Sequence, residues 1–277
     1  MTRSIASHPA IRRPLREDTT PMNKLPQITL AFWVMKICAT TLGETAGDLL
    51  SMTLDVGYAI SSMILISLFL VSLVTQLRAR TYNPALYWTV ILTTSTAGTT
   101  MSDFMDRTLG LGYASGSAIL ISLLLGVLAV WRFSEKSLSV DHIDSRRGEL
   151  FYWIAILVSN TLGTALGDYL ADDSGLGFAG GALLIGSLIA AVALAYYFTR
   201  LSHVLLFWLA FVLTRPFGAT LGDVLTKPHA KGGLDFGTVG SSAILAGVLV
   251  VLVVIAIRAQ RQQPLLQAIP LQDSPPR

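Results

Sequence analysis

Long apolar segments alternate with short polar breaks along this chain, and the pattern predicts a bundle of membrane-spanning helices. A helix needs roughly 20 apolar residues to cross a bilayer, and several segments come close to that length. They cover residues 28–53, 57–77, 85–106, 113–132, 150–171, 177–199, 203–225 and 238–257. Glycine, proline or charged residues fill the breaks and end the helices. We therefore expect an all-α, polytopic membrane helix bundle with eight transmembrane helices.

A pattern that begins at each of four tryptophans divides the chain into repeats. Trp33, Trp88, Trp153 and Trp208 are each followed by a glycine ten residues later, a glycine or serine after fourteen and an aspartate after fifteen. Each repeat is predicted to hold one helix with a polar stripe, a turn and one plain apolar helix. All four two-helix repeats then enter the membrane from the same side and are parallel. The tryptophans lie near helix starts, where they are predicted to anchor in the membrane interface.

The spacing of the repeats predicts two halves joined by a polar linker. Repeats 1 and 2 (the first four transmembrane helices) occupy residues 28–133, and repeats 3 and 4 occupy residues 150–258. Residues 134–149 form the linker, which is expected on the cytoplasmic side. Residues 1–27, which are basic, and residues 259–277 are predicted to be flexible cytoplasmic tails.

A turn that contains glycine follows the first helix of each repeat. Glycine permits the positive φ that a tight reversal needs. In the first three repeats the turn reads Asp55-Val-Gly-Tyr58, Gly110-Leu-Gly-Tyr113 and Gly175-Leu-Gly-Phe178. In the fourth repeat we expect it at residues 233–236, displaced by an insertion of three residues.

Small residues in the first helix of each repeat predict close helix packing. Small residues four positions apart let two membrane helices approach backbone to backbone. The positions are Gly43, Gly47, Gly98, Ser102, Gly163, Gly167, Gly218 and Gly222. We expect these four helices to converge at the centre of the bundle, while the second helices, rich in Leu, Ile, Val and Ala, face lipid.

Polar residues follow one face of the same four helices. Positions four apart lie on one side of a helix, and a carboxylate that faces hydrocarbon is costly. The stripes should therefore meet around a central path. Its acidic members are Glu44, Asp48, Asp103, Asp168 and Asp223. The other residues expected to line it are Lys36, Thr40, Ser95, Thr99, Asn160, Thr164 and Arg215.

Composition and charge place the chain in a membrane. Of its 277 residues, 52% are hydrophobic and only 13% are charged, which is outside the usual range of soluble domains. Lysine and arginine gather in the tails and in alternate loops, so that this side is predicted to be cytoplasmic, with both termini inside. We expect a multi-pass protein of the bacterial inner membrane. Its partners are then the lipid bilayer and inorganic ions rather than nucleic acid, and homo-oligomerisation stays open.

The acidic stripe points to cations. Five acids face two bases, Lys36 and Arg215, so the interior would carry a charge of −3 if every group were ionised. Such a site attracts cations. Carboxylate, hydroxyl and amide oxygens suit divalent ions such as Mn²⁺, Mg²⁺ or Ca²⁺, and neighbouring carboxylates can share and pass on protons. The sequence thus predicts a transporter that exports a divalent metal in exchange for protons, with the five acids as metal ligands or proton carriers and no cofactor.

Other interpretations of these residues stay open. The four aspartates could cap the next helix or bond to the turn backbone, Glu44 could pair with Arg215 or Lys36, and Lys36 could reach the interface by snorkelling. The protein could then be a passive channel or small-solute transporter without proton coupling, or a structural membrane protein with no transport. No catalytic triad, phosphate loop or cofactor fingerprint is visible, so an enzyme is not expected.

The fourfold Trp, Gly, Gly/Ser-Asp pattern, its glycine turns and the segment at residues 214–223, T-R-P-F-G-A-T-L-G-D, together resemble a known family. It is a bacterial family of multi-pass membrane proteins built from four tandem copies of a short repeat of unknown function. The resemblance covers about residues 24–258 and implies the fold and the location, but no catalytic residues. Separately, Glu44-Thr-Ala-Gly-Asp48 is similar to the E-x-G-D-[KR]-[ST] signature of calcium and manganese cation/proton exchangers. It differs by one inserted residue and lacks the basic residue after Asp48.

Overall fold

Eight long helices make up the structure, a computed structural model that describes residues 25–140, 143 and 145–267. No strand occurs in this part of the chain. The helices are α1 (Leu30–Asp48), α2 (Tyr58–Arg78), α3 (Pro84–Asp103), α4 (Tyr113–Glu135), α5 (Arg146–Asp168), α6 (Gly177–Phe198), α7 (His203–Thr226) and α8 (Thr238–Gln267). Each lies within a few residues of its predicted bounds, except that α8 continues into the segment predicted to be a tail. The other predicted tail residues, 1–24 and 268–277, lie outside the described residues.

Short helical segments extend three of these helices or follow them. They are the π-helical η1 (Leu49–Thr53), η2 (Phe104–Thr108) and η3 (Tyr169–Asp173), and the 3₁₀ helix η4 (His229–Lys231). Six of the described helices are long and apolar enough to cross a membrane, namely α2, α4, α5 with η3, α6, α7 and α8. Helices α1 and α3 are less apolar because threonine, serine, glycine and charged residues fill much of their length. Most of these polar residues are buried inside the protein rather than exposed to lipid.

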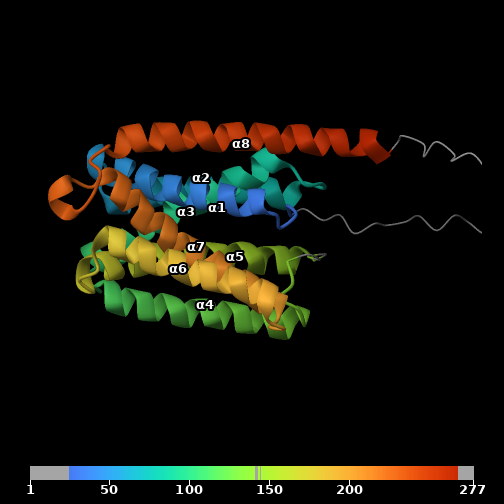
Figure 1. Cartoon of the computed structure of the whole chain (residues 1–277), viewed down its shortest axis with the longest axis horizontal. Helices are drawn as coiled ribbons and strands as arrows, with labels where there is room; N and C mark the ends of the chain where they lie inside the picture. Colours follow the sequence, from blue (N-terminus) through green and yellow to red (C-terminus); the bar gives the residue numbers. More distant parts are fainter. Residues whose placement is uncertain (1–24, 141–142, 144, 268–277) are drawn as a thin grey trace, which may run out of the picture.

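The odd-numbered helices form a ring, and the even-numbered helices surround it. Helix α1 packs against α3, α3 against α5, α5 against α7, and α7 against α1. Each even-numbered helix packs on the ring helix of the next repeat, so that α2 lies on α3, α4 on α5, α6 on α7 and α8 on α1. All eight run along the long axis of the bundle (Figure 1). The large side chains that α2, α4, α6 and α8 expose are mostly leucine, isoleucine and valine, which suits contact with lipid.

This packing exchanges two helices between the halves of the sequence. Helix α4 belongs to the first half but packs on α5, and α8 belongs to the second half but packs on α1. The bundle can therefore be divided into two groups of four helices, α1, α2, α3 and α8 in one and α4, α5, α6 and α7 in the other, which meet in the ring through α1 with α7 and α3 with α5. Figure 1 shows them as the upper and lower groups of helices. We name them the α1–α3 unit and the α5–α7 unit.

All four turns between the first and second helix of a repeat have the same backbone conformation. In each, two residues separated by one other residue have positive φ: Asp55 and Gly57, Gly110 and Gly112, Gly175 and Gly177, Asp235 and Gly237. The fourth turn is therefore Asp235-Phe-Gly-Thr238, and the predicted position at residues 233–236 is wrong. The insertion is five residues long, relative to Trp208, and it contains η4. We call this end of the bundle the turn end, and the end where the described chain starts and stops the terminal end.

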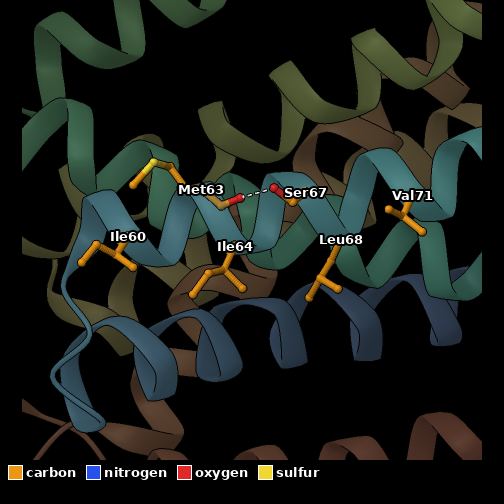
Figure 2. Close-up of a pocket in the computed structure, with 6 residues that line it drawn as sticks. All are labelled: Ile60, Met63, Ile64, Ser67, Leu68 and Val71. Carbon is orange, nitrogen blue, oxygen red and sulfur yellow. Dashed lines mark hydrogen bonds between the residues drawn. The ribbon is translucent and has the colours of Figure 1, made fainter.

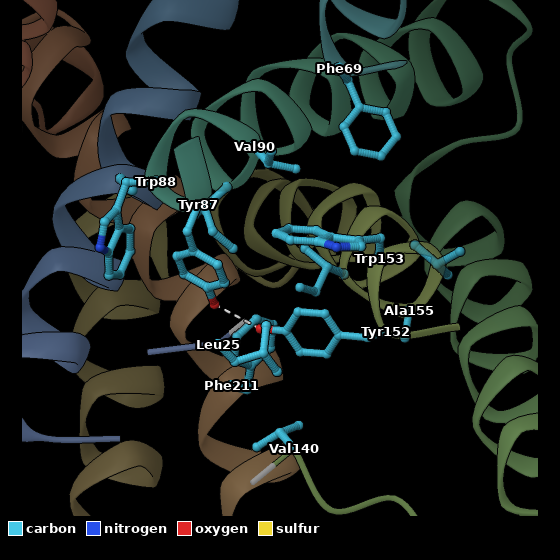
Figure 3. Packing of buried hydrophobic residues seen from close by; sticks show 14 of the residues in the cluster. Leu25, Phe69, Tyr87, Trp88, Val90, Val140, Tyr152, Trp153, Ala155 and Phe211 are labelled. Atoms are coloured by element: carbon cyan, nitrogen blue, oxygen red, sulfur yellow. Dashed lines mark hydrogen bonds between the residues drawn. The ribbon is translucent and has the colours of Figure 1, made fainter. Parts of the chain in front are cut away.

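An aromatic layer closes the ring near the terminal end. Each tryptophan of the repeat meets the aromatic residue that precedes the tryptophan of a neighbouring repeat. The pairs are Phe32 with Trp88, Tyr87 with Trp153, Tyr152 with Trp208 and Phe207 with Trp33. The hydroxyl groups of Tyr87 and Tyr152 are 2.7 Å apart and hydrogen-bonded (Figure 3). Trp88, Trp153 and Trp208 are buried, so the prediction that the tryptophans anchor in the membrane interface is wrong for these three. They fill the ring instead.

Candidate functional site

Polar residues occupy three successive layers across the ring between the aromatic layer and the turn end. Equivalent positions of the four repeats form each layer, and every member is at most 3% exposed. Counted from the aromatic layer, the second layer is Thr40, Ser95, Asn160 and Arg215, the third is Glu44, Thr99, Thr164 and Ala219, and the fourth is Asp48, Asp103, Asp168 and Asp223. The first layer, Lys36, Ile91, Ile156 and Phe211, is apolar except for the lysine. The structure thus brings all the predicted path residues into one ring.

Glycines bring the ring helices close together. In each of the four contacts, the first glycine of one repeat faces the second-layer residue of the neighbouring repeat. These pairs are Gly43 with Ser95, Gly98 with Asn160, Gly163 with Arg215 and Gly218 with Thr40. The second small position faces the third layer in the same way: Gly47 lies against Thr99, Gly167 against Ala219 and Gly222 against Glu44. Ser102 is the equivalent residue of α3 and is buried.

Glu44 and Arg215 form the centre of the third layer. Oε2 of Glu44 is 3.0 Å from Nη1 of Arg215 and accepts hydrogen bonds from the hydroxyls of Thr99 and Thr164, at 3.2 and 3.0 Å. Nη2 of Arg215 donates to the same two hydroxyls, at 2.6 and 2.8 Å, and to the carbonyl of Ser95. The pairing of Glu44 with Arg215 is thus present, and it includes hydroxyls from two further helices.

Two cations from the turn end bridge the four aspartates. Nζ of Lys227 is 2.8 Å from Asp48 and 3.1 Å from Asp223. Arg107 likewise lies 3.0 Å from Asp103, through Nε, and 3.1 Å from Asp168, through Nη2. No side-chain capping hydrogen bond is formed by Asp48, Asp103 or Asp168 at the helical segment that follows each of them. For these three described residues the capping interpretation is therefore wrong. Their carboxylates form ion pairs with Arg107 or Lys227 instead.

Sequence reasoning missed both cations by assigning them to loops. Arg107 and Lys227 each stand nineteen residues after the tryptophan of their repeat and four after its aspartate. Spacing by four puts a cation on the same helical face as the acid, so the signal was present. With Arg107, Lys227, Lys36 and Arg215, four cations face the five acids, and the formal charge of the ring is −1 rather than −3.

Lys227 lies just beyond the end of α7 and stays charged. Burial disfavours its ammonium form, but the carboxylates of Asp223 and Asp48 outweigh this effect and raise its pKa above the ordinary value. The ammonium group of Lys227 therefore acts as a fixed cation between the carboxylates of Asp48 and Asp223.

Lys36 has a different environment from the other cations. Its side chain is fully buried, and Nζ lies 4.1 Å from the centre of the Phe211 ring without a hydrogen-bond partner among the described residues. It does not snorkel to the interface, so that interpretation is wrong. Three more buried atoms without a hydrogen-bond partner belong to the second layer: Oγ of Ser95, Oδ1 of Asn160 and Nε of Arg215.

Three of the acids could hold a metal ion together. Glu44, Asp48 and Asp223 each offer a carboxylate oxygen within 4.8 Å of the other two. Asp103 and Asp168 are not part of this group and lie on either side of Arg107. Carboxylate oxygens at such separations suit hard divalent cations.

Two hollows lie outside the ring. One follows α2 between Ile60 and Val71 (Figure 2), and the other lies between α6 and α7. Their lining is almost entirely apolar and includes none of the five acids. Inside the ring, the polar side chains of the third and fourth layers contact one another or a shared cation from helix to helix and are buried.

Comparison with known proteins agrees with the internal repeat. Neither the curated proteins nor the solved structures contain a match to the chain. A family described as a repeat of unknown function, DUF347, matches four times, at residues 31–82, 86–137, 151–202 and 206–262. These matches begin two residues before each tryptophan and together cover most of the sequence. The chain therefore belongs to the family that this repeat of unknown function defines.

Proposed function

We propose that the protein is a membrane transporter that moves a divalent metal cation, such as Mn²⁺, in exchange for protons. The observation that supports this most directly is the cluster of Glu44, Asp48 and Asp223, whose oxygens lie within 4.8 Å of one another inside a ring of four helices. Acids buried in a membrane protein usually mark an ion pathway. Three carboxylates at this distance match the ligands of Mn²⁺, Mg²⁺ or Ca²⁺.

Exchange follows from the cost of burying charge. A metal ion binds these carboxylates only when they have lost their protons, and carboxylates left bare after the metal departs would be buried without compensation, which is strongly unfavourable. Protons or a protein cation must then replace the metal. Lys227 already takes this place at Asp48 and Asp223 in the structure. The metal would therefore alternate at Asp48 and Asp223 with Lys227 or with protons, and Lys227 would leave the two carboxylates when the metal binds.

The placement in the membrane follows from the packing. Helices α1 and α3 lie in the ring beside α5 and α7, which are long and apolar enough to cross. We infer that all eight helices cross, and that the terminal end faces the cytoplasm of a bacterium across its inner membrane. Cations that support this orientation lie in the C-terminal parts of the even-numbered helices, in the connections after them or in the first turn of α5: Arg78, Arg80, Arg132, Lys136, Arg146, Arg147, Arg200, Arg258 and Arg261. At the opposite end, Arg107 and Lys227 are neutralised by the ring aspartates.

A second candidate is a structural membrane protein with no transport. It is favoured by the ion pairing, because Glu44 and all four ring aspartates contact a cation in the structure. Fully paired charges can serve only to fix the arrangement of helices. The two candidates differ in whether the cluster ever exchanges its cation.

Flux into liposomes that contain the purified protein separates these candidates. With an acidic interior and a metal-sensitive dye inside, Mn²⁺ entry should be faster than in liposomes without a pH gradient. Asp48→Asn and Asp223→Asn should each reduce entry by roughly tenfold or more. The matched control is Asp55→Asn, since Asp55 is an exposed acid in a turn.

The outcomes of this experiment distinguish metal/proton exchange from a passive channel and from a structural protein without transport. Flux that ignores the pH gradient would support a passive channel and contradict exchange. Absence of flux for Mn²⁺, Mg²⁺ and Ca²⁺, with protein that is folded and correctly inserted, would overturn the transport proposal in favour of the structural one.

A further inference from the structure

The two packing units are joined differently at the two ends of the bundle. Within the described residues, the chain passes between the units only through η2 and its turn into α4 and through the segment from Lys227 to α8. Both crossings lie at the turn end. The connections at the terminal end, α2 to α3, α4 to α5 and α6 to α7, each stay within one unit.

Ion pairs reinforce the turn end. Arg107 and Lys227 lie at the start of the two crossings, and each pairs with an aspartate of its own repeat and one of the opposite unit. Each cation joins the units: Arg107 contacts Asp168 of α5, and Lys227 contacts Asp48 of α1. The covalent links between the units thus coincide with two of the ion pairs, and a third ion pair, Glu44 of α1 with Arg215 of α7, joins the units in the third layer.

Between the third layer and the terminal end, the units are joined by aromatic contacts and by neutral hydrogen bonds, among them those from Thr40 to the carbonyl of Thr214 and from Asn160 to Thr94. In the aromatic layer, Tyr87 of the α1–α3 unit contacts Trp153 of the α5–α7 unit and is hydrogen-bonded to Tyr152 (Figure 3). Trp33 of the α1–α3 unit likewise contacts Phe207 of the α5–α7 unit. The other terminal-end hydrogen bonds of this kind, from Trp208 to Leu138 and from Gln260 to Tyr82, stay inside one unit. Aromatic packing separates without leaving a charge unpaired.

In the described part of the chain, buried polar atoms without a hydrogen-bond partner lie between this aromatic layer and Glu44. They are Nζ of Lys36, Oγ of Ser95, Oδ1 of Asn160 and Nε of Arg215, and their residues are fully buried. A buried polar group without a hydrogen bond is costly and calls for an explanation, such as a state in which water reaches it. These atoms come from all four ring helices, and they mark a route from the terminal end to the cluster.

We propose that the α1–α3 unit and the α5–α7 unit pivot about the turn end, and that the aromatic layer around Tyr87 and Tyr152 is the gate that admits water and cations to Glu44. This inference rests on the proposed function for what passes the gate. The opening itself is independent of it. The opening ends at the third layer, where Arg215 keeps Glu44 and the hydroxyl of Thr164, and water satisfies Lys36, Ser95 and Asn160 between that layer and the gate.

Labelling of a buried cysteine tests the gate. Cys38 is the only cysteine, so Cys38→Ala gives a background in which Ser95→Cys is the reporter and Thr164→Cys a second one. Both positions have 0% exposure. A membrane-impermeant maleimide is applied to each face of sealed membrane vesicles. Cysteines at exposed Arg80 and at Asp55 identify the faces of the terminal end and the turn end.

The reporters should react from the face of the terminal end and not from the face of the turn end. Tyr87→Phe removes the hydrogen bond to Tyr152 and should speed this reaction about fivefold; Tyr87→Ala should speed it more. Tyr82→Phe is the matched control, because Tyr82 is a neighbouring tyrosine of the same unit, and it should leave the rate unchanged.

Other results would overturn the gate. These are faster labelling from the face of the turn end, an equal increase from both faces, or no change with either Tyr87 variant in correctly folded protein. The readout does not depend on transport. Labelling confined to the face of the terminal end without Mn²⁺ flux would overturn the proposed function and leave the gate, whereas flux with labelling from the turn end alone would overturn the gate only.

Discussion

Arg215 is the most constrained charge in the ring. It is fully buried, it pairs with Glu44, and it donates to two threonine hydroxyls and a backbone carbonyl. Burying an ion pair brings little net stability, but removing one partner leaves the other charge buried without compensation. The same residues that suit a cation site are therefore also those whose single replacement threatens the fold.

Replacing Arg215 alone should thus lower the free energy of unfolding more than replacing Glu44 and Arg215 together. We expect Arg215→Leu to lower the free energy of unfolding by roughly 3 kcal/mol, because Glu44 loses its cation, and Glu44→Gln with Arg215→Gln to recover much of this loss. Denaturation of the purified variants in detergent measures the difference. Arg200→Leu, at an exposed loop position, is the control and should stay within about 0.5 kcal/mol. A double variant that is less stable than Arg215→Leu would contradict the argument.

At this scale the sequence identified the acids but not all of their partners. The fourfold register and the cost of a lipid-exposed carboxylate were enough to predict that Glu44 and the aspartates face inward. The bridging by Arg107 and Lys227 was not predicted, because turn-end cations were interpreted only by their location in loops. The contact of each with the opposite unit depends on how the repeats pack, which a single repeat does not reveal.

Close approach of helices in the ring depends on positions without a side chain. A Cβ atom at Gly98 would lie 2.9 Å from the backbone of Asn160 and Thr161, and backbone cannot move aside as a flexible side chain can. Helix α4 offers a contrast, since nothing lies within 4 Å of a Cβ atom at Gly126. Two helical glycines of one protein therefore have opposite roles.

Gly98→Ala should destabilise the protein by about 1–3 kcal/mol through overpacking between α3 and α5. Gly126→Ala should be neutral or stabilise the protein by up to roughly 1 kcal/mol, because alanine is the better helix former. Thermal unfolding of both variants in the same detergent checks this. Equal effects of the two replacements would show that the ring contacts are looser than the structure has them.

The backbone of the four turns explains why the fourth turn was predicted two residues too early. The letters at residues 233–236 match the earlier turns, but the backbone needs positive φ at two residues separated by one, and Asp235 and Gly237 provide it. Aspartate tolerates this conformation better than most residues other than glycine. Similarity in residue types alone does not show which residues adopt positive φ.

Replacing Gly237 tests the corrected turn. Gly237 has φ +68°, so Gly237→Ala should cost about 1–2 kcal/mol in strain. Gly240 lies three residues further on, inside α8, with open space around its Cβ position. Gly240→Ala should therefore not destabilise the protein. Unfolding midpoints of the two variants give the comparison, and a harmless Gly237→Ala would contradict the assignment of the fourth turn.

The whole molecule shows an exchange of helices that the repeat pattern did not predict. Helix number, direction and the convergence of the four polar helices followed from apolar lengths and register. The sequence also divides into two halves, yet α4 packs on α5 and α8 on α1, across that division. Nothing in the composition of α4 or α8 marks the ring helix on which it packs, since apolar residues fill most of both helices and the polar residues gather mainly near their ends.

This exchange should make the two halves depend on each other. If the chain is split after residue 140, the first fragment carries α1 to α4 and the second α5 to α8. Each alone would expose ring charges, Glu44 in one and Arg215 in the other, together with a helix that has lost its packing partner. Coexpressed fragments should therefore co-purify through a tag on one of them, and each expressed alone should aggregate or be degraded. Glu44→Lys, which sets a cation against Arg215, should reduce recovery of the untagged fragment, whereas Asp55→Asn should not. Fragments that purify separately as stable, monodisperse proteins would contradict the interlocked packing, because each half would then bury its own ring face.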